Sequence, residues 1–131
     1  MSPKALSFFN WPAEDQANWL TVLSPGDRFD GRGPAAHWSQ ASVNSIRYAY
    51  GRWLGFIESV GSGLLKEAPG SRFTRAVVQN YVYSLQSEVS AATTFIYVDH
   101  LLCAAQVMFP ARDWDWLKAV LRRLRRDITP R

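Results

Sequence analysis

The chain has 131 residues, with 15 lysines and arginines against 11 aspartates and glutamates, two histidines and one cysteine. This length allows one domain, or one domain with an arm, and it excludes most two-domain enzymes. One cysteine cannot form an internal disulfide, and Cys103 with His37 and His100 gives too few ligands for a structural zinc site unless carboxylates complete it. We therefore expect a reducing, cytoplasmic setting and no metal or other cofactor.

The apolar residues, 47% of the sequence, do not form a membrane span. Asp99, His100 and Gln106 interrupt the longest apolar stretch, so no run reaches the roughly 20 residues that a span requires. The first twelve residues also lack the apolar segment of a secretory signal. We expect no membrane partner.

The net charge of +4 is unevenly distributed. Residues 1–30 hold two basic and four acidic groups, a net charge of −2, whereas residues 31–131 hold 13 basic and 7 acidic groups, a net charge of +6. Twelve of the fifteen cations are arginines, whose planar guanidinium suits phosphate and base edges. This pattern favours a nucleic-acid partner mildly over an ordinary solvated surface.

The first predicted helix begins at Pro12, which the first turn tolerates, and Glu14 and Asp15 complement its N-terminus. It ends at the turn signal Ser24-Pro25-Gly26. Residues 25–41, with three glycines and two prolines, are predicted to form an irregular connector. The predicted apolar face of this helix consists of Trp19, Leu20 and Leu23.

The second predicted helix covers residues 42–60, with Ser42 as its N-cap. Gly51 and Gly55, four residues apart, would permit close approach of another helix or of a DNA backbone. The predicted buried stripe consists of Val43, Ile46, Tyr50, Trp53, Leu54, Ile57 and Val60. The opposite side carries Asn44, Arg47, Tyr48, Gly51, Gly55 and Glu58.

Three more helices follow, capped by Thr74, Ser90 and Asp113. The third buries Val77, Val78, Tyr81, Val82 and Leu85. The fourth, residues 91–108, has the core stripe Thr94, Val98, Leu101, Leu102 and Ala105 and the polar stripe Thr93, Tyr97 and His100. The last places Lys118, Arg122 and Arg125 outward and Trp114, Leu117, Val120, Leu121 and Leu124 inward. We predict an all-α fold: a compact four-helix bundle over residues 38–127, preceded by a helical arm and connector over residues 1–37.

Catalytic groups do not cluster in this sequence. Cys103 lies within an apolar helix and is best interpreted as a small buried hydrophobe. Asp113 and Asp115 favour the positive end of a helix rather than acid–base chemistry. No glycine-rich phosphate loop is present either. We therefore predict that this chain is not by itself an enzyme.

The order of several short motifs resembles the N-terminal core-binding domain of tyrosine recombinases of the phage-integrase type. The resemblance covers about residues 38–126, and each motif is weak alone. The matching segments are Ser45-Ile46-Arg47-Tyr48 through Leu54 and Phe56-Ile57, Thr74 through Val78 with Tyr81-Val82 and Leu85, Ser90 through Thr93-Thr94, and Trp116-Leu117 through Arg126.

The resemblance implies a SAM-like helical bundle that forms half of a clamp around a recombination site. Two helices, here 42–60 and 91–108, would cross the major groove. The partners implied are double-stranded DNA and other recombinase protomers. The catalytic tyrosine and its helpers belong to a separate domain in that family, so residues 128–131 would begin a linker to a domain that this sequence does not contain.

The predicted DNA-binding residues combine the polar faces given by periodicity with the helices given by the resemblance. Arg52 has an open alternative, an ion pair with Glu58 or Asp99, and the arginines of the last helix have the alternative of an exposed surface. A helical protein–protein module without DNA binding is the competing functional class. The predicted DNA-binding residues are Ser42, Asn44, Ser45, Arg47, Tyr48, Arg52, Thr93, Tyr97, His100, Lys118, Arg122, Arg125 and Arg126.

Overall fold

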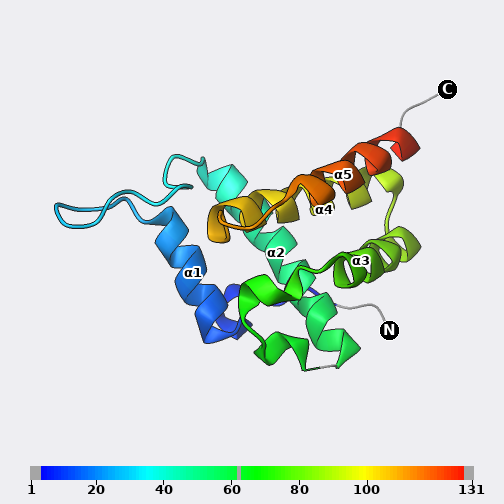
Figure 1. Ribbon diagram of the computed structural model, residues 1–131, viewed down its shortest axis with the longest axis horizontal. Helices are drawn as coiled ribbons and strands as arrows, with labels where there is room; N and C mark the ends of the chain where they lie inside the picture. Colours follow the sequence, from blue (N-terminus) through cyan, green and yellow to red (C-terminus); the bar gives the residue numbers. More distant parts are fainter. Residues whose placement is uncertain (1–3, 62, 129–131) are drawn as a thin grey trace.

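The computed structural model describes residues 4–61 and 63–128, and this part of the chain is helical without β-strands. Five α-helices pack as a bundle: α1 (Ala13–Leu23), α2 (Gln40–Val60), α3 (Arg75–Glu88), α4 (Ala91–Met108) and α5 (Asp115–Ile128) (Figure 1). Short 3₁₀ turns cover Phe8–Asn10, Leu64–Lys66 and Pro69–Arg72. The predicted all-α bundle is confirmed. The expected linker begins inside the last turn of α5, and residues 129–131 lie outside the described part.

Helix α4 is the centre of the bundle, because it contacts α1, α2, α3 and α5. Its inward stripe includes Val98 and Leu101, which have no exposed surface. By length and composition alone α4 would also pass as a membrane span. In the described fold, 33% of this helix is buried, and it contacts four other helices.

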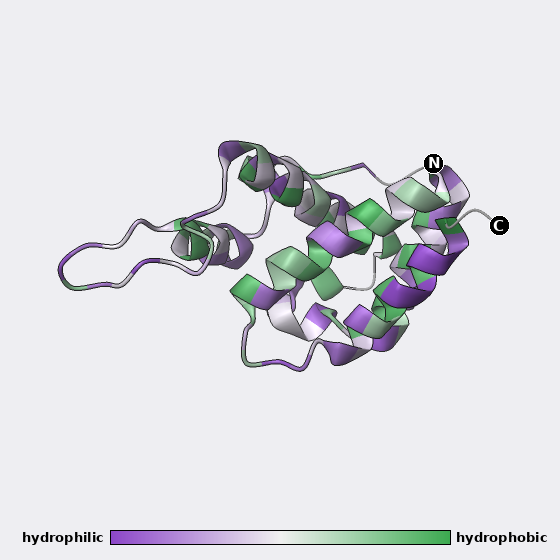
Figure 2. Cartoon of the chain, turned by 90° about the horizontal axis from the view of Figure 1, so that it is seen from above, coloured by the Kyte–Doolittle hydropathy of each residue, from purple (hydrophilic) through white to green (hydrophobic). Residues whose placement is uncertain are grey.

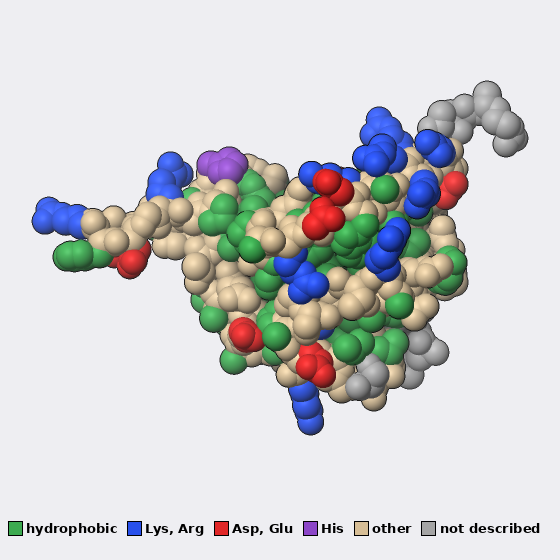
Figure 3. Space-filling view, in the orientation of Figure 1, with side chains coloured by type: hydrophobic (Ala, Val, Ile, Leu, Met, Phe, Trp, Pro, Cys, Tyr) green, Lys and Arg blue, Asp and Glu red, His purple; other side chains and the backbone are tan. Residues whose placement is uncertain are grey.

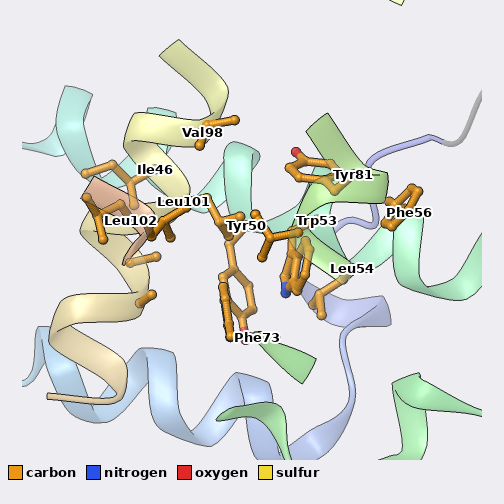
Figure 4. Packing of buried hydrophobic residues seen from close by; sticks show 14 of the residues in the cluster. Ile46, Tyr50, Trp53, Leu54, Phe56, Phe73, Tyr81, Val98, Leu101 and Leu102 are labelled. Carbon is orange, nitrogen blue, oxygen red and sulfur yellow. The ribbon is translucent and has the colours of Figure 1, made fainter. Parts of the chain in front are cut away.

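The core is rich in aromatic rings that join α2 to α3 and to the loop between them (Figure 4). The Trp53 ring stacks on Phe73 at 4.8 Å between centroids and meets the edge of Tyr81 at 5.3 Å. Aromatic pairs in these geometries add stability beyond their buried area. The predicted buried stripe of α2 is therefore largely confirmed, although Val60 at its end is 46% exposed.

Side-chain caps fix where the helices begin. Thr74 and Ser90 accept hydrogen bonds from the backbone nitrogens of Val77 and Thr93, as predicted. The predicted cap at Ser42 is wrong: α2 begins at Gln40, and the Ser39 hydroxyl accepts from the Ser42 nitrogen at 3.1 Å. Gln and Ala between the two serines are good helix formers, so the helix extends to the earlier cap.

The N-terminal helix packs on the bundle, a point that the sequence left open. Trp19 is buried as predicted, and Val22 is buried beside it. Leu20, which was predicted to lie on the apolar face with Trp19, is 58% exposed. Asp15 was predicted to complement the helix N-terminus, but its carboxylate is buried and paired with Arg72. Tyr50 of α2 donates a hydrogen bond to the same carboxylate at 2.6 Å.

The two glycines of α2 make room for the chain's own N-terminal segment. A Cβ on Gly51 would lie 2.5 Å from the Leu6 carbonyl oxygen, and one on Gly55 would collide with the Lys4 carbonyl oxygen. The Leu6 nitrogen also donates to the Gly51 oxygen at 3.0 Å. The sequence predicted another helix or a DNA backbone as the close neighbour of these glycines. The structure instead places residues 4–6 there.

A loop over residues 24–33 projects from the bundle between α1 and α2, as Figure 2 shows from above. Asp27 stabilises its tip by accepting hydrogen bonds from the backbone nitrogens of Phe29 and Asp30, each at 2.8 Å. These two hydrogen bonds lower the pKa of Asp27 below its ordinary value. The Phe29 side chain at the tip is 94% exposed.

Candidate nucleic-acid interface

Two rows of polar and aromatic side chains lie side by side on α2 and α4. Asn44, Tyr48 and Arg52 follow each other at four-residue spacing on α2, which places them on one face. Tyr97 and His100 belong to the facing row of α4, and the rings of Tyr48 and Tyr97 are 6.0 Å apart. The two rows share one solvent-open face.

A shallow hollow of about 350 Å³ lies between these rows. Five of its six lining residues were predicted from the sequence to bind DNA; the sixth, Ile96, is apolar and 46% exposed. The lining residues are Asn44, Ser45, Tyr48, Ile96, Tyr97 and His100. Folding therefore brings together groups that are about 50 residues apart in the sequence.

A second hollow of about 450 Å³ lies on the other side of Tyr48. Leu6, Ser7, Phe8 and Phe9 line it together with Asn44, Arg47 and Tyr48. The side-chain oxygen Oδ1 of Asn44 accepts from Arg47 Nη2 at 3.1 Å and from Gln40 Nε2 at 2.9 Å. The N-terminal segment is thus part of this face, a contribution that the sequence analysis missed because no local pattern relates residues 6–9 to α2.

Arg52 occupies the end of the α2 row, where α2, α3 and α4 meet. Its guanidinium carbon lies 4.8 Å from the centre of the Tyr97 ring. Its Nη1 is 3.5 Å from the Tyr48 hydroxyl and its Nη2 is 3.6 Å from Oε2 of Glu88. The carboxylate partner is therefore Glu88, the last residue of α3, and not Glu58 or Asp99.

The predicted cations of α5 lie on the exposed side of that helix, and blue side chains follow it in Figure 3. Lys118 is 3.8 Å from Oδ1 of Asp115, and both side chains are well exposed, so this pair contributes little to stability. The Arg125 guanidinium lies 5.8 Å from the Phe95 ring of α4. Arg122 and Arg126 are exposed.

A third hollow, of about 400 Å³, separates α3 from α5. Val78, Val82 and Leu124 give it an apolar floor, and Arg75 and Arg123 are among its lining residues. It contains none of the predicted DNA-binding residues. The sequence did not predict this hollow.

The remaining predicted groups have ordinary structural surroundings. Thr93 donates its backbone nitrogen to the Ser90 cap, and its hydroxyl is 3.1 Å from that of Ser90. Ser42 lies exposed in the first turn of α2. Burial and then the neighbouring Asp99 carboxylate raise the pKa of the Cys103 thiol, which holds it in the less reactive protonated form.

Comparisons with protein-family models, with curated proteins and with solved structures give no match for this chain. Within residues 4–61 and 63–128, no three His, Cys, Asp or Glu side chains gather as a metal site would need. The face formed by α2 and α4 is the part of the described structure that gathers most of the predicted DNA-binding residues of these two helices.

Proposed function

We propose that this chain is a DNA-binding module, equivalent to the N-terminal core-binding domain of a site-specific tyrosine recombinase, and that it does not cleave DNA strands alone. The observation that carries the proposal is the hollow between α2 and α4. Residues chosen from helical period and motif order, such as Asn44, Tyr48 and His100, line that one hollow.

The chemistry of this face suits a duplex. Asn and His side chains offer the donors and acceptors that read base edges, and tyrosine and arginine bind phosphates. Arg47 lies half-buried beside Asn44, whose side-chain oxygen Oδ1 orients the guanidinium. Helices α2 and α5 both pack on α4. The exposed cations of α5 provide further phosphate contacts to a duplex that spans from α2 to α5.

The deciding experiment is duplex binding followed by fluorescence anisotropy over a series of salt concentrations. We expect the affinity to fall steeply as salt rises, with a logarithmic slope of about −0.9 for each phosphate contact. The Arg47→Ala, Arg122→Ala, Arg125→Ala triple variant should bind more weakly with a shallower slope. Arg28→Ala, Arg32→Ala and Arg75→Ala together form the matched control, since these three exposed arginines lie outside the proposed face.

Equal weakening by both triple variants would indicate general charge attraction and contradict the proposed face. Absence of salt-dependent binding to any duplex would contradict DNA binding by the module. Sequence preference is then tested with a library of duplexes, in which Asn44→Ala and His100→Ala should relax the preference at separate positions.

The hollow between α3 and α5 favours a second candidate, a helical protein–protein module. Tyr83 on its wall is 58% exposed, and an exposed tyrosine beside an apolar floor is typical of interaction surfaces. Under this alternative, the Tyr83→Ala variant, which changes an exposed side chain and leaves the core intact, loses partner binding while the Arg47 triple variant retains it. Under the DNA-binding proposal, the variant in the α3–α5 hollow still binds the duplex, and the Arg47 triple variant binds it more weakly.

A further inference from the structure

Two arginines are largely withdrawn from water in this fold, and their hydrogen bonding differs sharply. Arg72 is fully buried, and its guanidinium donates to Asp15 at 2.8 Å and to the carbonyl oxygens of Leu64, Leu65 and Glu67 at 3.0, 2.8 and 3.2 Å. These distances are those of full-strength hydrogen bonds. Four hydrogen bonds thus hold Arg72 as a structural cation.

Arg52, by contrast, has only 16% of its side chain exposed, yet none of its contacts has an ordinary hydrogen-bond length. Its Nη1 lies 3.5 Å from the Tyr48 hydroxyl, and its Nη2 lies 3.6 Å from Oε2 of Glu88. Its Nε is buried without a partner. A guanidinium has five donors, and leaving them unpaired away from water is unfavourable.

The Tyr81 hydroxyl near Arg52 also lacks a hydrogen bond of good geometry, although it is buried on α3. Burial raises the pKa of Tyr81, and Arg52 lies close enough to oppose that rise through its charge and a weak hydrogen bond. The Nε of Arg52 and the Tyr81 hydroxyl therefore both lack a hydrogen bond of good geometry, and the guanidinium lies over the Tyr97 ring. Such a set of donors is complementary to an oxyanion with several acceptor oxygens.

Glu88 occupies the position where that oxyanion would bind. Its carboxylate neutralises Arg52, but at 3.6 Å it makes an ion pair without a true hydrogen bond. Both side chains are mostly buried, and an ion pair of imperfect geometry does not fully offset the cost of taking its charges out of water. A phosphate has more oxygens and more charge than a carboxylate and is able to approach the guanidinium bidentately.

We propose that Arg52 is a phosphate-binding site held closed by Glu88 in the free protein. A phosphate group replaces the Glu88 carboxylate on the guanidinium, and the Tyr48 hydroxyl donates to the same group. The source of that phosphate under the proposed function is the DNA backbone beside the α2 and α4 rows, so the inference rests on that function and names how one contact is regulated.

The test is a double-mutant cycle on duplex affinity using the full chain. We expect Glu88→Gln to tighten binding about fivefold, because no ion pair then has to be broken. Arg52→Gln should weaken binding, and adding Glu88→Gln to it should then have little effect. Glu58→Gln is the matched control, since Glu58 is an exposed carboxylate on α2 and the ion pair of Arg52 is with Glu88.

Equal tightening by Glu88→Gln with and without Arg52 would overturn the proposal, because it would reflect only the lost negative charge. So would tightening by Glu58→Gln to the same extent, or no tightening by Glu88→Gln. Arg52→Lys, which keeps the charge and the fold but loses the planar fork, should bind between the wild type and Arg52→Gln.

A second measurement separates this inference from the proposed function. Inorganic phosphate, compared with chloride at equal ionic strength, should raise the melting temperature of Glu88→Gln more than that of the wild type, and should not raise that of Arg52→Gln. If phosphate stabilises in this way but no duplex binds, the proposed function fails and the oxyanion site stands. If duplex binds by way of Arg47 and neither arm of the Arg52 test responds, the site fails and the function stands.

Discussion

Asp15 of α1 and Arg72, 57 residues further along the chain, form a buried ion pair in which Nη1 lies 2.8 Å from Oδ1. Neither residue retains exposed surface. The pair fastens the first helix to the loop before α3, and Tyr50 joins it from α2. Three distant segments are thus joined at one carboxylate.

Arg72→Met should destabilise the fold by about 3–5 kcal/mol, because it leaves the Asp15 charge buried without its cation. The measurement is the free energy of unfolding from urea denaturation followed by circular dichroism. Arg75→Met is the matched control, because Arg75 is exposed on the next helix, and it should change stability by less than about 0.5 kcal/mol. Equal losses in the two variants would contradict a structural role for the pair.

The two most buried tyrosine hydroxyls should respond in opposite ways to removal. Tyr50→Phe deletes the hydrogen bond to Asp15 and should destabilise by about 1–3 kcal/mol. Tyr81→Phe removes a buried hydroxyl without a partner, so stability should stay the same or rise. Urea denaturation of both variants at neutral pH provides the comparison, and a larger loss for Tyr81→Phe would contradict this assignment.

Alkaline pH should unfold the protein through the same tyrosines. Burial, and for Tyr50 also the Asp15 charge, raises the pKa of Tyr50 and of Tyr81 above the ordinary value of 10.0. The folded state therefore favours the protonated hydroxyls, so this stability is complete below pH 10 and is lost as pH rises above it. Denaturation midpoints between pH 8 and about 11 should fall, and less steeply in Tyr50→Phe than in the wild type.

Gly55→Ala should release the N-terminal segment, because its methyl group would collide with the Lys4 carbonyl oxygen. The gain in helix propensity of about 1 kcal/mol works against this loss, so the net change in stability is small. The sharper readout is amide hydrogen exchange, in which the Leu6 nitrogen should lose protection. Gly31→Ala is the control, since no atom lies within 4 Å of the added methyl group. Retained protection of Leu6 in Gly55→Ala would contradict the packing.

Trypsin should cut the folded chain first after Arg28 or Arg32. Both lie exposed in the projecting loop, where the backbone is free to enter a protease, whereas the exposed arginines of α5 are helical. The two fragments should stay together in size-exclusion chromatography, because α1 remains held by Trp19 and Asp15. Mass spectrometry identifies the site, and a first cut within α5 would count against this account.

Local features of this fold were predictable from the sequence because they depend on neighbours three or four residues away. The caps at Thr74 and Ser90 and the buried stripe containing Trp53 are of this kind. Ser39 and Ser42 are both residues that can cap a helix, and they lie three positions apart. The sequence predicted Ser42 as the N-cap of α2, whereas Ser39 forms it. The exposure of Leu20 was missed because α1 is buried along only part of the face that its period predicts.

Long-range partners were not predictable in the same way. Asp15 follows the rule for acidic residues in a first helical turn, and nothing near it indicates Arg72. Glu88 ends α3 as an ordinary polar residue, and only the packing of α3 beside α2 brings it to Arg52. The rows on α2 and α4 could be predicted one helix at a time, but their meeting around one hollow required the fold.

The central position of α4 has a consequence for synthesis on the ribosome. The helices before residue 91 share aromatic contacts and the Asp15–Arg72 pair, but α1, α2 and α3 also pack on α4, so the core stays incomplete while α4 is still inside the exit tunnel. The surfaces of α1, α2 and α3 that face α4 remain uncovered during that interval. The nascent chain should therefore depend on chaperones until its fourth helix emerges, and then fold in a single late step.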